Sequence, residues 1–393
     1  MTSLNDRLQR ATVPDRECHR PEFLRLSEPG DRVRMEALLD REPHVMVSDD
    51  LRSQLGELVR TLNPSRIFST EEREAAVDRH LGDTPAEEYG VWVYYPWSRR
   101  LVHLLDEAEF AMVRTDRNRN KITAQEQAEL ANKRIGVIGL SVGQSICLTL
   151  ALERGFGELR IADFDTLELS NLNRIRSATY EMGHAKAVNV AREIAELDPF
   201  LKVTVYTEGL SRSNVDRFLT EGGALDVLVD ECDSVDVKIM GRLRAKEHGI
   251  PVVMDTSDRG LIDVERFDLE PDRPIMHGYL EELDLSVIER PMTNAEKLPF
   301  LLAMVGTDTL SDRMKASLPE VGKTLVTWPQ LASGVTLGGA IVADLIRRMC
   351  LGQMSSSGRW WVDLNDLLTE ATSAVPPFRK TISPAEQDRL RYV

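Results

Sequence analysis

The stretch that decides the fold runs from Arg134 to Lys186 and reads RIGVIGLSVGQSICLTLALERGFGELRIADFDTLELSNLNRIRSATYEMGHAK. A short apolar run turns through Gly139–Gly143 into a helical segment, and a second apolar run ends at Asp163. This pattern predicts a strand, a glycine turn, a helix and a parallel strand. The turn and the helix N-terminus then lie at the carboxyl edge of the sheet, where free N–H groups and the helix dipole favour an anion. Asp163 follows Gly139 at roughly the spacing of 20 residues from which an acid contacts a ribose hydroxyl, so the stretch predicts a nucleotide site.

The rest of the chain predicts an α/β fold, Rossmann-like, in which a mostly parallel sheet carries helices on both faces. Short β-branched runs alternate with helical patterns as far as Met254, as in sheets built from strand–helix–strand units. We expect three segments: a small α+β module over residues 1–115, the nucleotide domain over 116–375 and a tail over 376–393.

The module opens with a polar, proline-punctuated arm of about 30 residues. Helical patterns are then expected near residues 33–39, 51–62 and 71–81, followed by a hairpin over 90–95 and 100–105. The hairpin is rich in aromatic residues, namely Trp92, Tyr94, Tyr95 and Trp97. They can form a peptide-binding edge or pack inside the module, and packing is the favoured interpretation.

Polar groups recur after the central strands, as Asp165, Ser170–Arg174, Gly183–Lys186 and Val229–Ser234. At these residues the chain resembles the ThiF/MoeB/HesA superfamily, the relatives of ubiquitin-activating enzymes that adenylate a carboxylate with ATP. The resemblance covers about residues 116–267 and a helical tail to about residue 352. Four motifs in the family's order are far more specific than one glycine turn.

The chemistry of such a reaction can be argued from the residues themselves. A carboxylate that attacks the α-phosphate of ATP brings two anions together, so the site must supply positive charge. Arg174 and Lys186 follow the same strand edge as the glycine turn and suit this role. Mg²⁺ needs few protein carboxylates, because it keeps water and phosphate oxygens as ligands. Asp233, just past a buried strand, is placed to hold it.

The resemblance implies a role for each residue of the site. ATP would lie on Gly139, Ser141 and Gly143, with Asp163 and Asp165 near the ribose and Asn171 near a phosphate or the adenylate. The catalytic group would comprise Arg174, Lys186, Asp233 as the magnesium ligand, and Arg119. Arg119 lies in a segment, Arg117–Asn120, which in the family reaches the partner subunit's ATP site. The resemblance therefore implies a homodimer with composite active sites.

Two features depart from the family. The four cysteines form no C-x-x-C pair, so the zinc site of many relatives is not expected. The irregular segment 280–323, which in some relatives carries a thioester-forming cysteine, contains none. A thioester needs a thiolate, so we expect the acyl adenylate to be used directly.

The composition limits the partners and the location. The formal net charge of −15 argues against nucleic acid and anionic membranes. No apolar run reaches eighteen residues, and the charged N-terminus does not resemble a signal peptide. These observations predict a soluble, cytoplasmic protein that binds neither.

The substrate stays open between alternatives. The module and the missing cysteine resemble the branch that modifies ribosomally made peptides, where an extra domain grips a leader peptide. The first alternative is a ubiquitin-like sulfur-carrier protein with a Gly-Gly end. A dehydrogenase would bind NAD on the same strand, turn and acid. A non-catalytic nucleotide-binding scaffold is the other alternative, because Ser141 and Val142 replace the family's two central glycines.

Overall fold

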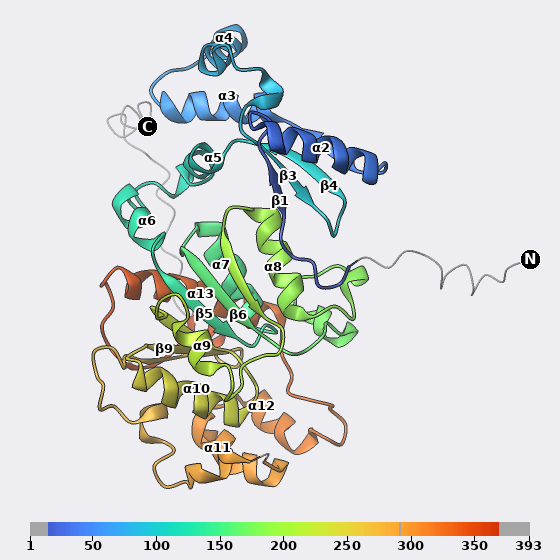
Figure 1. Ribbon diagram of the computed structural model, residues 1–393. Coiled ribbons are helices and arrows are strands. Elements are labelled where there is room, and N and C mark those ends of the chain that lie inside the picture. The colour runs from blue at the N-terminus through green and yellow to red at the C-terminus, as the bar shows by residue number, and fades with distance from the viewer. Residues whose placement is uncertain (1–14, 291, 369–393) are drawn as a thin grey trace, which may run out of the picture.

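The computed structural model describes residues 15–290 and 292–368, and it contains two separate sheets (Figure 1). Residues 22–114 build a four-stranded sheet with its own helices, and the following residues build a seven-stranded sheet. The expected tail, 376–393, lies outside the described residues.

The seven-stranded sheet confirms the prediction of a mostly parallel α/β fold. Its strand order is β11-β10-β9-β8-β5-β6-β7. Five neighbouring strands, from β9 to the edge strand β7, pair in parallel. They are β5 (Arg134–Ile138), β6 (Glu158–Ala162), β7 (Lys202–Tyr206), β8 (Val227–Asp230) and β9 (Val252–Thr256). Two antiparallel strands complete the other edge, β10 (Leu261–Glu265) and β11 (Gly358–Trp361).

Helices cover both faces of this sheet (Figure 1). One apolar core joins the strands to α7 (Gly143–Glu153), α8 (Lys186–Leu197) and α13 (Ala332–Cys350). Cys147 is fully buried in it. A second core, on the other face, joins them to α9 (Val215–Thr220), α10 (Val235–Glu247) and α11 (Asn294–Val305). The small residues of α13 allow a close approach to α7, because a Cβ on Gly339 would lie 2.2 Å from Ser145 Oγ.

The N-terminal module has the strand order β1-β3-β4-β2. Its elements are β1 (Glu22–Leu24), α2 (Pro29–Arg41), β2 (Met46–Asp49), α3 (Leu51–Leu62), α4 (Thr70–Leu81), β3 (Val91–Tyr95), β4 (Arg100–Leu104) and α5 (Glu107–Arg114). Helices α2, α3 and α4 and the hairpin of β3 and β4 match the prediction. The strands β1 and β2 were not foreseen, and β1 lies in the segment expected to be an arm.

Three of the four hairpin aromatics lie inside the module, as the favoured interpretation held, whereas Trp97 is partly exposed and donates a hydrogen bond from Nε1 to Glu196 of α8 at 2.6 Å. Trp92, Tyr94 and Tyr95 are buried in β3, which is an inner strand. Phe200 of the larger unit contacts two module rings, with centroid distances of 5.5 Å to Phe23 and 5.3 Å to Phe110. The module is therefore joined to the larger unit through packed aromatic side chains.

Short elements complete the chain. The remaining α-helices are α6 (Ala124–Leu130), α12 (Asp312–Ser317) and α14 (Leu364–Leu367). The 3₁₀ turns are η1 (Ala86–Glu88), η2 (Asp116–Asn118), η3 (Leu169–Asn173), η4 (Thr179–Glu181), η5 (Ile275–Gly278), η6 (Leu285–Glu289), η7 (Thr307–Thr309) and η8 (Leu318–Glu320).

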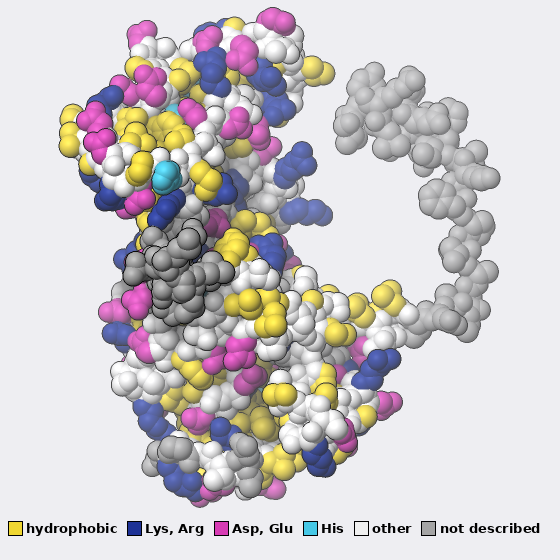
Figure 2. All heavy atoms as spheres, turned by 90° about the vertical axis from the view of Figure 1, so that its right-hand side faces the viewer, with side chains coloured by type: hydrophobic (Ala, Val, Ile, Leu, Met, Phe, Trp, Pro, Cys, Tyr) yellow, Lys and Arg dark blue, Asp and Glu magenta, His cyan; other side chains and the backbone are white. Residues whose placement is uncertain are grey.

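The surface carries charges of both signs. On the face shown in Figure 2, acidic and basic side chains are interspersed over both units. Among the described residues, none of the helices has the length and apolar character needed to span a membrane.

Candidate active site

The glycine turn between β5 and α7 is shaped by close backbone contacts. Gly139 adopts a φ of +83°, and a Cβ there would lie 2.5 Å from the carbonyl oxygen of Glu231. Gly143 begins α7, and a Cβ on it would lie 2.7 Å from Val137 Cγ1. No side chain caps the N-terminus of α7 within the described residues. Its first N–H groups are therefore available to an anion.

Asp163 holds the turn in place from the end of β6. Its Oδ2 accepts a hydrogen bond from Leu140 N at 2.6 Å, and its Oδ1 accepts one from Asp165 N at 2.8 Å. Burial raises the pKa of this carboxyl, against the attraction of the Lys186 charge. In this structure Asp163 therefore anchors the backbone, in addition to lining the cavity where a ribose was expected.

Lys186 joins three of the predicted site residues. It is the first residue of α8 and only 6% exposed. Its Nζ lies 2.7 Å from Asp165 Oδ2 and donates to Ser141 Oγ at 3.2 Å. Ser141 thus accepts a hydrogen bond from the lysine at a position where a glycine would offer no hydroxyl. The ammonium is fixed beside the glycine turn.

Asn171 and Arg174 lie on the turn that follows, around η3. Asn171 is buried, and its Oδ1 accepts a hydrogen bond from Glu168 N at 3.1 Å. Arg174 donates to Asn173 Oδ1 at 3.0 Å. Burial lowers the pKa of Arg174, and the nearby charge of Asp233 opposes that shift. Arg174 and Asp233 therefore lie within electrostatic reach of each other, whereas Asn171 caps its own turn.

A cavity of about 280 Å³ lies at this edge of the sheet. It is lined by the glycine turn, by the ends of β6 and β8 and by one residue of α11, the last being Lys297. Lys297 supplies a cation that the sequence analysis missed. It lies in the irregular segment 280–323, where no spacing links it to the other motifs, so the sequence held no signal for it.

Asp233 is an exposed residue at the mouth of this cavity. In the described part of the chain, no hydrogen bond or ion pair occupies its oxygens, and no group of three or more metal-ligating side chains occurs. A single free carboxylate matches the way Mg²⁺ binds beside phosphates, through one or two carboxylates and substrate oxygens. The residues present therefore fit a magnesium ion held by Asp233.

A second cavity, of about 230 Å³, adjoins the first. The two share Glu231, Cys232 and Asp233. Val142, which replaces a family glycine, has a negative φ and lines the second cavity. Among the described residues it is not part of the lining of the first. Its side chain therefore points to the neighbouring chamber, away from the expected phosphates.

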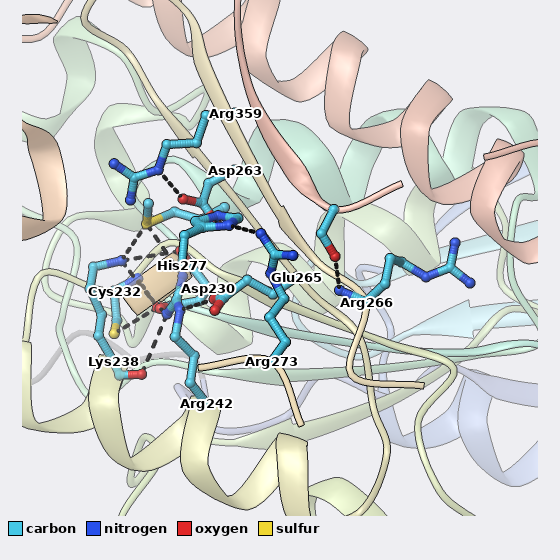
Figure 3. Close-up of polar contacts among 12 residues, drawn as sticks. Asp230, Cys232, Lys238, Arg242, Asp263, Glu265, Arg266, Arg273, His277 and Arg359 are labelled. Atoms are coloured by element: carbon cyan, nitrogen blue, oxygen red, sulfur yellow. Dashed lines mark hydrogen bonds and ion pairs between the residues drawn. The ribbon is translucent and has the colours of Figure 1, made fainter. Parts of the chain in front are cut away.

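A buried charge network supports the turn that carries Asp233 (Figure 3). Asp230, at the end of β8, pairs with Lys238 at 3.2 Å and with Arg242. Burial and the Asp230 charge raise the pKa of the Cys232 thiol. A thiol with a raised pKa is a poor nucleophile, so Cys232 is poorly suited to a nucleophilic role.

Arg119 stands apart from both cavities. It forms an ion pair with Asp116 at 3.2 Å and is about half exposed. It is absent from the described residues that line either cavity. Its assignment to the partner subunit's site stays a prediction.

Two buried carboxyl groups lie beside the turn that carries Asp233. Glu231 Oε1 accepts a hydrogen bond from Asp255 N at 2.9 Å. Burial raises the pKa of Asp255 to about 7, and burial together with the Asp255 charge raises that of Glu231. A carboxyl whose pKa is raised on folding favours the folded state when protonated. That contribution is complete below pH about 4 and disappears as the pH rises through about 7.

We therefore expect Asp255→Asn to stabilise the protein at pH 8 but not at pH 4. A shift from 3.8 to about 7 corresponds to a gain on the order of 4 kcal/mol at the higher pH. Thermal unfolding at both pH values measures it, with the exposed Asp272→Asn as the control. An equal change in melting temperature at the two pH values would contradict the assignment.

Comparisons with known proteins place the chain among relatives. The family model described as "ThiF family" matches residues 115–280. An uncharacterized protein of Mycobacterium tuberculosis, MT1398, is 47% identical over 293 residues, which are 75% of this chain and 40% of that protein. The tRNA threonylcarbamoyladenosine dehydratase of Bacillus subtilis is 22% identical over 244 residues, 59% of this chain and 94% of that enzyme.

Among solved structures, E. coli MccB with MccA-N7isoASN has a TM-score of 0.42 and 11% identity, covering 77% of this chain and 80% of that one. The chain spans less than half the length of the M. tuberculosis relative. The family match covers the glycine turn, Asp163, Lys186 and Asp233. The chain thus carries a ThiF family domain over residues 115–280 and is a homologue of the ThiF/MoeB/E1-like adenylating enzymes.

Proposed function

We propose that this protein uses ATP and Mg²⁺ to adenylate a carboxylate on a peptide and uses the acyl adenylate directly. One observation carries the proposal: a free carboxylate lines one cavity, a fixed ammonium contacts its lining, and a second cavity adjoins it. The carboxylate is that of Asp233, and the ammonium is that of Lys186, which contacts the lining residues Ser141 and Asp165. An enzyme that joins ATP to an acid needs two adjoining compartments, one for each reactant.

The residues have distinct tasks in the proposed reaction. An oxygen of the substrate carboxylate bonds to the α-phosphorus, and the bond to the bridging oxygen breaks, which releases pyrophosphate. Lys186, Arg174 and the N–H groups of α7 offset the negative charge that gathers there. Asp233 would hold Mg²⁺, which supplies further positive charge at the phosphates. Asp163 keeps the turn in the shape that presents these N–H groups.

The N-terminal module offers an edge on which a peptide can bind. Its strand β2 is the outer strand of the small sheet, and all four of its residues are exposed. A peptide can add to such an edge through main-chain hydrogen bonds. The buried aromatics of β3 do not provide this edge. We therefore place the peptide-recognition role on β2.

Other candidate functions give different results in simple assays. A dehydrogenase would be stabilised by NAD, whereas our proposal expects ATP to raise the melting temperature and NAD to leave it unchanged. A non-catalytic scaffold would bind ATP without exchanging pyrophosphate. A sulfur-carrier substrate would support exchange only when a protein ending in Gly-Gly is supplied.

The direct test is exchange of labelled pyrophosphate into ATP. The protein is incubated with ATP, Mg²⁺ and a panel of carboxylate peptides, with and without EDTA. We expect exchange that depends on a peptide and is abolished by EDTA. ATP binding with no exchange for any peptide or Gly-Gly carrier would favour the scaffold.

The composite site makes a separate prediction. If Arg119 completes the partner subunit's site, Arg119→Ala and Asp233→Ala subunits should each be inactive alone. In an equal mixture, half of the dimers are mixed and each has one intact site, so activity should recover to about a quarter of the wild-type value. Pyrophosphate exchange by the mixture measures this, and mixed dimers purified through two different tags should recover about half of the wild-type activity.

A matched mixture serves as the control. Arg119→Ala subunits mixed with subunits that carry both substitutions contain no intact site and should stay inactive. Failure of the tagged mixed dimer to recover activity would remove the assignment of Arg119 to the partner subunit's site.

A further inference from the structure

The second cavity is an apolar chamber built largely by α11. Four residues at positions i, i+3, i+4 and i+7 of this helix line it: Leu298, Leu301, Leu302 and Val305. This spacing places them on one face of the helix. Met304 of the same helix also lines it, and other elements supply further apolar side chains, among them Val142, Met254, Met314, Trp328 and Trp361.

The chamber adjoins the nucleotide cavity. Both are lined by Glu231, Cys232 and Asp233, and the helix that lines the chamber also places Lys297 in the nucleotide cavity. A carboxylate that reaches the α-phosphate beside Asp233 therefore has its own substituent directed toward the chamber.

Size and charge limit what the chamber can hold. An apolar cavity of about 150 Å³ binds benzene, so about 230 Å³ accommodates an aromatic ring or a branched aliphatic chain. Four acids line the chamber, Glu231, Asp233, Asp255 and Asp258. Lys238 also lines it, but its ammonium already pairs with Asp230 at 3.2 Å. A second carboxylate on the substrate would therefore lie beside acidic groups, next to a cation that is already engaged.

We propose that the chamber binds the apolar side chain of the residue whose carboxylate is activated. The substrate class is then a peptide that ends in an aromatic or branched aliphatic residue, and not one that ends in glycine or an acidic residue. This inference rests on the proposed adenylation in the adjoining cavity.

Binding of short peptides tests the chamber without requiring turnover. The probes are N-acetyl-Gly-Phe, N-acetyl-Gly-Leu, N-acetyl-Gly-Gly and N-acetyl-Gly-Asp, titrated in the presence of ATP and Mg²⁺. Tryptophan fluorescence follows binding, because Trp328 and Trp361 line the chamber, and calorimetry gives the dissociation constants. Burial of one large apolar side chain predicts that the Phe and Leu peptides bind about 10- to 100-fold more tightly than the Gly peptide.

Two variants link this preference to the chamber. Leu302→Trp fills the space and should remove the preference for the Phe peptide, whereas Leu269→Trp, at an exposed leucine, should preserve it. Met314→Ala enlarges the chamber and should favour N-acetyl-Gly-Trp over N-acetyl-Gly-Phe relative to wild type. This second variant removes atoms, so it tests the chamber even if Leu302→Trp does not fold.

The outcomes separate this inference from the proposed function. Dissociation constants for the Gly and Phe peptides within threefold of each other, or no binding of any peptide, would overturn the chamber assignment. Selective binding of the Phe peptide without pyrophosphate exchange would support the chamber and count against adenylation. Exchange only with Gly-ended peptides would support adenylation and overturn the chamber assignment.

Discussion

Lys186→Ala is expected to lower the rate of pyrophosphate exchange by about 10²- to 10³-fold, with a much smaller loss of ATP affinity. The ammonium is buried beside the glycine turn, 3.2 Å from Ser141 Oγ. Negative charge at the α-phosphate grows as the carboxylate attacks, so the lysine contributes more to the transition state than to bound ATP. Exchange kinetics and ATP calorimetry measure the two quantities separately.

Two further variants control for charge and folding. Lys202→Ala removes an exposed ammonium that pairs with Glu158, and it should leave exchange unchanged. Lys186→Arg keeps the charge and should retain part of the activity. Equal losses in ATP binding and in turnover for Lys186→Ala would contradict a transition-state role, provided that the melting temperature shows a folded protein.

Asp233→Asn should have an effect of similar size through the metal. The carboxylate is exposed, lines both cavities and is not engaged in any hydrogen bond among the described residues. Its neutral amide binds Mg²⁺ more weakly, so we expect exchange to fall about 10²-fold or more and to need a higher Mg²⁺ concentration for half-maximal rate. A titration of the exchange rate with Mg²⁺ measures both effects.

The control for this variant is Asp40→Asn, an exposed acid on helix α2 of the module. It changes the net charge by the same amount and should leave the Mg²⁺ dependence unaltered. An Asp233→Asn protein with a lower rate but the wild-type Mg²⁺ dependence would mean that Asp233 acts without the metal.

Residues at strand ends were predictable because their places follow from chain order alone. Parallel strands bring their carboxyl ends to one edge, so Gly139, Asp163 and Asp233 had to lie near each other once β5, β6 and β8 were recognised. Their partners were less predictable. That Asp163 anchors the glycine turn, and that Asn171 caps its own turn, depends on backbone geometry that spacing does not describe.

Short strands and the packing of distant segments could not be predicted from the sequence, for a different reason. Strands β1 and β2 have three and four residues, too few to show an alternating pattern. They exist because β3 and β4 offer edges on which they can pair. The direction of Val142 was likewise decided by packing around α7, and not by its size relative to glycine.

The sequence by itself determined the parallel sheet, the anion-binding turn, and the lysine and aspartate at its edge, because strand periodicity and chain order fix these positions. Only the tertiary structure decided that α11 brings Lys297 to the nucleotide cavity and an apolar face to the chamber beside it. Helix α11 begins at Asn294, after 28 residues (266–293) that follow the end of β10 and carry the turns η5 and η6. Its position depends on packing against α10 and the second core, which no local pattern encodes.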